Sequence, residues 1–131
     1  MKKFLLTIGL MIMTIIIVKG QDTKKSEGGP EIKFENVEHD YGTITQGGDG
    51  NCVFKFKNTG NDVLILSDVR KSCGCTTPTW SKEPVLPGQK GEIKVGYNTN
   101  NIGQFNKNIT VISNANNATV VLTIKGNVVA K

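Results

Sequence analysis

The segment 72–78 (SCGCTTP) holds two of the three cysteines of this chain, Cys73 and Cys75, separated by a single glycine. Two thiolates at this spacing could chelate a soft metal ion such as Cu(I), because thiolate sulfur suits soft cations. They could equally close a local disulfide, which requires Cα atoms about 4.4 to 6.8 Å apart. A third alternative is a structural corner in which one of the two forms a bridge to a distant cysteine.

Cys52 is the remaining cysteine, and it lies on the inward face of the alternating segment 51–58 (NCVFKFKN). In a sandwich, the start of this strand and the end of a strand over 63–69 would lie at the same end of the domain, next to the Cys-Gly-Cys loop. We therefore predict that Cys73 or Cys75 forms a disulfide with Cys52 after export. Closing a loop of about 22 residues would stabilise the fold by roughly 3 kcal/mol in the chain-entropy model.

His39 is the single histidine of the chain. With Cys52, Cys73 and Cys75 it would complete a four-ligand set of the kind that binds zinc, and these four residues form an alternative metal site. The separation between His39 and the cysteines argues instead for a surface or turn histidine. The main prediction therefore contains no metal ligand and no cofactor.

The sequence offers no catalytic set. Thiol-exchange enzymes commonly place Cys-x-x-Cys at a helix N-terminus, which favours the thiolate, whereas here Cys-x-Cys follows a strand. A Ser-His-Asp set could draw only on His39, and the sequence contains neither paired carboxylates nor a phosphate-binding loop. We therefore predict that the protein is not an enzyme and has no catalytic residues.

Residues 1–20 have the layout of a secretory signal peptide. A cationic start (MKK) precedes an apolar run over 4–18, and the segment ends in Val-Lys-Gly. The run would form a helix of about 22 Å, shorter than the roughly 30 Å hydrocarbon core, so membrane contact is expected only if the leader stays uncleaved. We predict an exported protein of the periplasm, outer cell envelope or extracellular space, where disulfides form.

The charge balance argues against nucleic-acid binding. The full chain has 16 basic and 11 acidic residues, a net charge of +5. Removal of residues 1–20 takes away three lysines and no acid, leaving 13 basic and 11 acidic residues, a net charge of +2, without a cluster of five cations. Residues 21–31 (QDTKKSEGGPE) are polar and end in a Gly-Gly-Pro-Glu stretch, which predicts a flexible linker before a domain over 32–131.

Short strands with frequent turns fill the rest of the chain. Alternating or apolar segments are separated by turns rich in Gly, Asn and Pro, and the expected strands cover 32–34, 37–44, 51–58, 63–69, 80–83, 92–97, 105–113 and 119–127. The first two form a split first strand. The pattern does not decide which face of 63–69 points inward. Strands without intervening helices predict an all-β fold, an immunoglobulin-like antiparallel β-sandwich of about seven strands.

Alternation also predicts the core. The inward side chains share a period of two along each strand, with Trp80 at the margin. The expected core residues are Phe54, Phe56, Ile93, Val95, Tyr97, Ile109, Val111, Val120, Leu122 and Ile124.

Several local patterns resemble a known bacterial family. They are HDYG at 39–42, FKFKNTG at 54–60, SCGCT at 72–76, Pro-Gly at 87–88, Ser-Asn at 113–114 and IKG at 124–126. Together they resemble the family catalogued as domain of unknown function 1573, which comprises exported Ig-like proteins, over roughly 32–128. More distantly, the Asn-Thr-Gly and Pro-Gly turns resemble sperm-protein-like and pilus-chaperone-like domains, which bind other proteins. The resemblance supplies no catalytic residues, and Cys52 departs from the family pattern.

Two function hypotheses follow. The first is an exported Ig-like binding or scaffolding module of the bacterial cell envelope, whose partner is another envelope or surface protein. The second is a small metal-binding or thiol-active envelope protein that uses the Cys73-Gly74-Cys75 loop. A structural surface protein without a discrete partner is a third alternative.

Overall fold

The computed structural model describes residues 28–131, so the predicted signal peptide and most of the predicted linker lie outside the described residues. The described part contains eight β-strands and no helix, and therefore no helix that could cross a membrane. The strands are β1 (Ile32–Phe34), β2 (Glu38–Thr45), β3 (Asn51–Asn58), β4 (Leu66–Lys71), β5 (Thr76–Trp80), β6 (Lys90–Tyr97), β7 (Gly103–Ser113) and β8 (Thr119–Val129).

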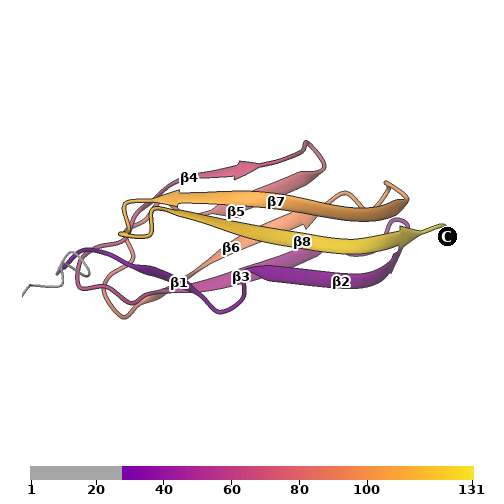
Figure 1. The fold of residues 1–131 in the computed structure, drawn as a ribbon. Helices are drawn as coiled ribbons and strands as arrows, with labels where there is room; N and C mark the ends of the chain where they lie inside the picture. Colours follow the sequence, from indigo (N-terminus) through magenta and orange to yellow (C-terminus); the bar gives the residue numbers. More distant parts are fainter. Residues whose placement is uncertain (1–27) are drawn as a thin grey trace, which may run out of the picture.

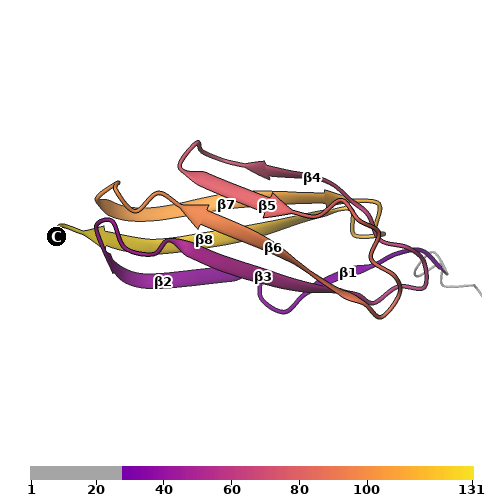
Figure 2. The same ribbon diagram turned by 180° about the vertical axis from the view of Figure 1, so that it is seen from behind.

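The strands form two packed four-stranded sheets, with the order β1-β3-β6-β5 in one and β2-β8-β7-β4 in the other (Figures 1 and 2). β1 and β2 belong to different sheets, which confirms the split first strand. The Ig-like sandwich is thus confirmed, with eight strands rather than about seven. The expectation of purely antiparallel pairing is wrong at one place, because β2 runs parallel to its neighbour β8. A first strand that crosses between sheets reaches its second partner in the parallel direction.

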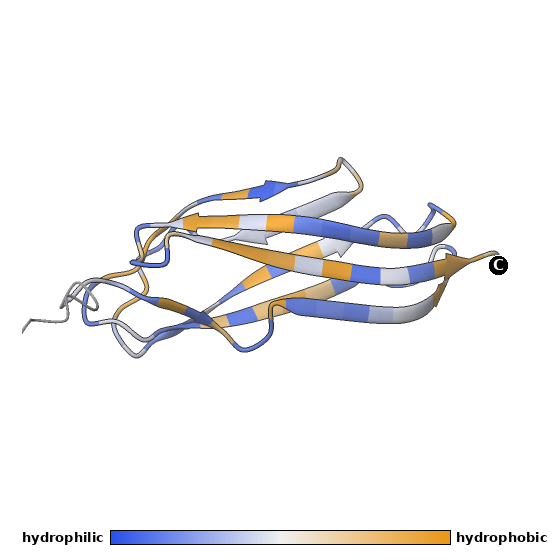
Figure 3. Cartoon of the chain, viewed as in Figure 1, coloured by the Kyte–Doolittle hydropathy of each residue, from blue (hydrophilic) through white to orange (hydrophobic). Residues whose placement is uncertain are grey.

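Alternating hydrophobicity places the core between the sheets (Figure 3). β3 shows the pattern most clearly, with every second residue buried along its whole length. Of the predicted core residues, all but Val120 are buried, and Val120 and Trp80 are half-buried residues that pack against the core. Cys52 is buried, as its inward position predicted, and the prediction missed further buried apolar residues, namely Ile32, Phe34, Leu64, Leu66, Val69, Phe105, Ala115 and Val128.

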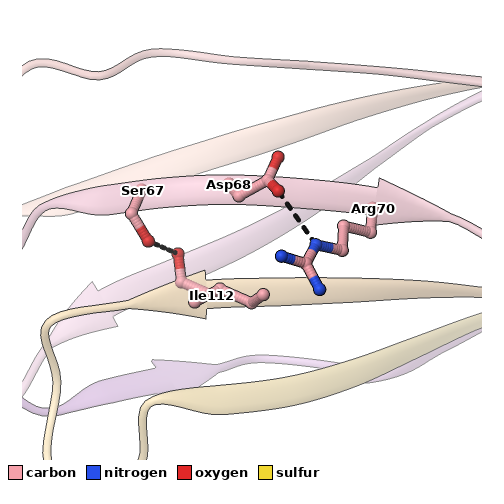
Figure 4. Close-up of polar contacts among 4 residues, drawn as sticks. All are labelled: Ser67, Asp68, Arg70 and Ile112. Atoms are coloured by element: carbon pink, nitrogen blue, oxygen red, sulfur yellow. Dashed lines mark hydrogen bonds and ion pairs between the residues drawn. The ribbon is translucent and has the colours of Figure 1, made fainter.

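The structure of β4 explains why the sequence pattern did not show which face of this strand points inward. Leu66 and Val69 are both buried although they are three residues apart. A register shift against β7 between Leu66 and Asp68 inserts one extra residue, and such a bulge changes the parity of the strand. Figure 4 shows the result, in which the Ser67 hydroxyl donates to the Ile112 carbonyl at 3.1 Å and Asp68 pairs with Arg70 at 3.0 Å.

Most strand boundaries differ from the prediction by up to three residues, as for β4, which was expected over 63–69, and two further differences concern the segments expected to be loop and linker. The strand expected over 80–83 is instead β5, which begins at Thr76 inside the segment treated as a loop and ends at Trp80. Residues 28–31 of the predicted linker are packed on the domain: the Gly29 amide donates to the Asn61 side chain at 2.7 Å, and the Pro30 carbonyl accepts from the Asn116 amide at 2.8 Å. Asparagine side chains and turn amides satisfy this backbone, so residues 28–31 belong to the packed domain.

Candidate functional site

The loop that connects β4 of one sheet to β5 of the other holds Cys73 and Cys75 at its tip, and a disulfide joins them with their Cα atoms 5.3 Å apart. Both are half-buried, while Ser72 and Gly74 beside them are exposed. Cys52 is a free, buried cysteine. The structure therefore has the local disulfide that the spacing allowed, and the predicted bridge from Cys52 is wrong.

The sheet order explains why Cys52 cannot reach the cysteines at the tip of the β4–β5 loop. Cys52 pairs with Val95 on β6, and Val95 pairs with Pro78 on β5. β6 thus lies between the two cysteine-bearing segments, which puts them about 9 to 10 Å apart at two strand spacings. Cys75 lies three residues beyond Pro78, so its Cα is farther away than a disulfide permits. The prediction placed all three cysteines at the correct end of the sandwich but did not foresee the intervening strand.

Backbone hydrogen bonds anchor the tip to both sheets. On one side, the Ser72 amide donates to the Asn108 carbonyl at 3.0 Å, and the Ser72 hydroxyl accepts from the Asn108 amide at 3.0 Å. On the other side, the Asn98 amide donates to the Cys75 carbonyl at 2.9 Å. Thr76 is fully buried and its hydroxyl donates to the Cys73 carbonyl at 3.1 Å. The loop 72–75 is therefore held at both ends independently of the sulfur atoms.

Cys52 is a buried residue of β3 and lies in a different environment from the two cysteines of the β4–β5 loop. Its thiol lies beside the hydroxyl of Tyr41, which donates to the Gly50 carbonyl at 2.7 Å. Burial raises the pKa of the Cys52 thiol, and the hydrogen bond with Tyr41 lowers it by a smaller amount. Burial, followed by the interaction with Cys52, raises the pKa of Tyr41 far above its usual range. Both groups are therefore held in their neutral forms.

His39 lies apart from the tip of the β4–β5 loop. It is on β2, paired with Ile124 of β8, and its ring stands edge-on against Tyr41 with centroids 4.5 Å apart. Within residues 28–131 no group of three or more His, Cys, Asp or Glu side chains is arranged to hold a metal ion. The structure therefore does not bring Cys52, Cys73, Cys75 and His39 together as the ligand set of the alternative prediction.

A cleft of about 480 Å³ lies at the opposite end of the sandwich, beside the loop 81–89. Phe56, Val85 and Leu86 contribute its apolar surface, and Leu86 is 55% exposed. Glu83 and Lys90 line it with charges of opposite sign. A larger hollow of about 630 Å³ between β2, β7 and β8 is lined mainly by polar residues. Ligand sites are mostly apolar with a few polar groups, so the cleft beside Leu86 is the better candidate.

Asn58 holds the loop 81–89 in place. This side chain is fully buried, and its amide nitrogen donates to the carbonyls of Asp62 at 2.7 Å and Val85 at 2.9 Å. The Gly88 amide donates to the Asn58 carbonyl at 2.8 Å, and Val85 and Leu64 exchange two backbone hydrogen bonds. The sequence signals for this site were the Asn-Thr-Gly and Pro-Gly turns, but nothing in them pointed to Leu86.

The edge strands of the described sheets are all interrupted. β1 has three residues, and β2 has an irregular register beside Gly42, whose φ is 66°. β4 carries a bulge and the Asp68–Arg70 pair, and β5 contains Pro78. Bulges, charges and proline on edge strands disfavour pairing with another strand. The clefts and loops are therefore better suited to contact another molecule than the sheet edges are.

Several solved structures share this fold. The chain is similar to a protein of unknown function from Porphyromonas gingivalis W83 (14% identity, TM-score 0.68), covering 80% of this chain and half of that one. It is also similar to a PapD-like domain of human CEP192 (8%, TM-score 0.68; 82% and 91%) and to a chaperone–tip adhesion subunit complex from Acinetobacter baumannii (9%, TM-score 0.53; 76% and 57%).

At these identities the likeness shows the fold alone, a β-sandwich like that of PapD-like domains, and assigns no specific activity. No curated protein sequence matches the chain. A family model does match, over residues 32–128, which is most of the chain and nearly all of the described domain. The family indicated by the SCGCT loop and the flanking turns is thereby confirmed: the chain belongs to the family described as protein of unknown function (DUF1573).

Proposed function

We propose that this protein is a non-enzymatic binding module of the bacterial cell envelope, and that it holds another envelope or surface protein at the cleft beside Leu86. The observation that carries the proposal is the exposed Leu86 side chain next to a cleft whose lining is partly apolar and partly charged. Leu86 leaves more than half of its surface open to solvent, while Phe56 below is buried. A partner side chain of apolar character would cover this surface.

Rigidity of the cleft supports the proposal. The loop 81–89 is tied to Asn58 and Leu64 by hydrogen bonds of 2.8 to 3.0 Å. Binding to a loop that is already ordered avoids the entropic cost of fixing it. The charged residues Glu83 and Lys90 beside the apolar surface would orient the partner more than they would strengthen its binding.

The fold of the neighbours is consistent with a binding role. The Acinetobacter baumannii structure is a pre-assembly complex of a chaperone with a tip adhesion subunit, so a domain of this shape there engages another protein. Export is part of the proposal and depends on the leader-like residues 1–20. The periplasm or outer envelope is then the compartment in which the partner would be found.

A photo-crosslinking residue placed at position 86 in the native host tests the proposal. We expect a discrete crosslinked species in the envelope fraction, because position 86 would face the partner. Val121 is the matched control, since it is 49% exposed but lies on β8 in the other sheet. The intact mass of the recovered protein should correspond to a chain without residues 1–20.

Loss of the crosslink in competition with excess wild-type protein, but not with Leu86→Asp, would establish that the cleft is the contact. Identical crosslinks at positions 86 and 121, or none at either, would contradict the proposal. Retention of residues 1–20 in the recovered protein would contradict export by cleavage. Thermal unfolding of Leu86→Asp serves as the folding control, because an exposed substitution of this kind changes stability by less than about 0.5 kcal/mol.

A further inference from the structure

We propose that the Cys73–Cys75 disulfide is a reversible redox couple that exchanges with external thiols at the tip of the β4–β5 loop. The tip lies at the same end of the sandwich as the C-terminus, opposite the loop 81–89 (Figures 1 and 2). This activity is therefore independent of binding at the cleft beside Leu86.

Gly74 gives the first argument. The adjacent Cys73 and Cys75 aside, a Cβ atom at position 74 would meet no atom within 4 Å, and the φ of Gly74 is not among the positive values found at other glycines. The fold therefore does not require glycine here, on either steric or conformational grounds. The missing side chain instead leaves the approach to the neighbouring sulfur atoms open, and access governs the rate of thiol–disulfide exchange.

The second argument is that the tip does not depend on the sulfur bond. Hydrogen bonds anchor Ser72 to β7 and Cys75 to the residue that follows β6, and Thr76 ties its buried hydroxyl to the Cys73 carbonyl. A disulfide between residues two apart also constrains the unfolded chain very little. Reduction should therefore leave the loop in place, with both thiols positioned to form the bond again.

The two sulfur atoms are not equivalent. Cys75 packs against the core, whereas Cys73 does not. The Cys75 amide donates to the Cys73 sulfur at 3.1 Å, and a hydrogen bond of this kind favours a thiolate there after reduction. Cys73, which does not pack against the core, is therefore the one attacked in the oxidised protein and the nucleophile in the reduced protein, while Cys75 resolves the mixed disulfide.

The exchange balances as follows. An external thiolate attacks the Cys73 sulfur, the Cys73–Cys75 bond breaks, and Cys75 leaves as a thiolate that takes up the proton released by the attacking thiol. A second external thiol then attacks the mixed disulfide, which releases Cys73 as a thiol and forms an external disulfide. Two external thiols are oxidised to one disulfide, and the protein disulfide is reduced to two thiols.

Equilibration of the full-length chain in thiol–disulfide buffers tests the proposal. Cys52→Ala removes the third thiol, and alkylation followed by mass measurement counts the thiols formed at each ratio. One arm uses reduced and oxidised glutathione, a monothiol, and the other uses a protein dithiol of Cys-x-x-Cys type. We expect folded protein with two thiols, and complete return of the Cys73–Cys75 bond when the buffer is made oxidising.

Reduction in both arms would show that a monothiol is sufficient, and reduction by the dithiol protein alone would identify a protein dithiol as the partner class. Absence of reduction in both arms under native conditions would overturn the proposal. Failure of the reduced protein to form the Cys73–Cys75 bond again would overturn it equally.

Three variants test the roles of the individual residues. Cys75→Ser should form a mixed disulfide with glutathione disulfide at least about tenfold faster than Cys73→Ser, because Cys73 does not pack against the core. Gly74→Val should slow exchange of the intact pair by about tenfold at an unchanged melting temperature, since its side chain would shield the adjacent cysteines without meeting the rest of the fold. Equal rates for the two serine variants, together with an undiminished rate for Gly74→Val, would refute the assignment.

Discussion

Asn58 is fully buried, and every hydrogen-bonding group of its side chain has a partner. The amide nitrogen donates to two carbonyls, and the amide oxygen accepts from the backbone of Gly60 at 3.0 Å and, at 3.4 Å, of Glu31. A single side chain thus connects the segment 28–31, the turn 59–62 and the loop 81–89. Because buried polar groups left without partners are costly, this residue stabilises three separate pieces of backbone at once.

Asn58→Ala should lower the free energy of unfolding by about 2 to 4 kcal/mol, since each buried backbone group left without a partner costs about 1 to 3 kcal/mol. Asn58→Asp should be at least as harmful, because a carboxylate would face the carbonyls of Asp62 and Val85. Urea denaturation measures both changes. Asn106→Ala is the matched control on an exposed residue, and a loss at position 106 as large as that at position 58 would contradict this account.

The cysteines show where prediction from the sequence ends at this scale. The alternation of β3 correctly placed Cys52 in the core. The end of the sandwich at which Cys52 lies was also predicted correctly. Which cysteines pair, however, depends on which strand lies between them, and the position of β6 between β3 and β5 has no local signature. Leu86 was missed for a related reason, because exposure beside a cleft is a property of the assembled loop.

The β3–β6 pair shows how two strands share one volume. Phe56 pairs with Gly91, and a Cβ atom at position 91 would clash with the Phe56 ring. Glycine therefore occurs in the middle of a strand, where it is normally unfavourable, because the aromatic ring fills the space above it. Alternation predicted Phe56 as a core residue but gave no reason for Gly91.

We expect the substitutions Phe56→Ala and Gly91→Ala to be strongly non-additive. Phe56→Ala should cost about 3 to 5 kcal/mol as a large-to-small core change, and Gly91→Ala about 1 to 3 kcal/mol by overpacking. In the double variant the ring is absent, so the added methyl group no longer clashes and partly fills the cavity. A double-mutant cycle by urea denaturation should give a coupling of about 0.5 to 3 kcal/mol.

Lys55→Ala is the control for this pair, since Lys55 is exposed on the other face of β3 and should change stability by less than about 0.5 kcal/mol. Strict additivity at positions 56 and 91 would mean that the two residues do not share a volume.

Strands with a regular period of two were predicted best, and β4 and β5 were predicted least well. The bounds of β3 were predicted, and those of β6, β7 and β8 differ by only a few residues, because one face of each packs on the core throughout. β4 changes its inward parity at a bulge, and β5 is rich in threonine with a proline. In both, the strand is specified by its partner in the sheet rather than by its own pattern.

At the scale of the whole molecule, aromatic side chains join the two sheets near the end of the sandwich that carries the β4–β5 loop. Tyr97 of β6 stacks on Phe105 of β7 with ring centroids 3.8 Å apart, and Tyr41 of β2 packs against the same ring at 5.6 Å. The Tyr41 hydroxyl reaches Gly50 and Cys52 in the opposite sheet and its preceding turn. The contact between the sheets therefore includes ionisable groups that must remain neutral.

This arrangement predicts that stability falls in alkaline solution. Burial raises the pKa of Tyr41, Cys52 and Tyr97 in the folded protein, so the unfolded chain loses these protons first as the pH rises past about 8.5 for cysteine and about 10 for tyrosine. The folded state then binds more protons than the unfolded state, and the free energy of unfolding decreases with pH. Their stabilising effect is complete below those values and is lost above them.

Urea denaturation between about pH 8 and pH 11 should show a slope approaching about −1.4 kcal/mol per pH unit for each group whose unfolded form has ionised. Tyr41→Phe should be less stable at neutral pH, because it loses the 2.7 Å hydrogen bond to Gly50, but its stability should fall less steeply with pH. Cys52→Val should also flatten the curve at its lower-pH end. Ser67→Ala removes a hydroxyl that does not titrate in this range, so its slope should equal that of the wild type. A Tyr41→Phe curve parallel to the wild-type curve would show that the tyrosine hydroxyl is not held neutral between the sheets.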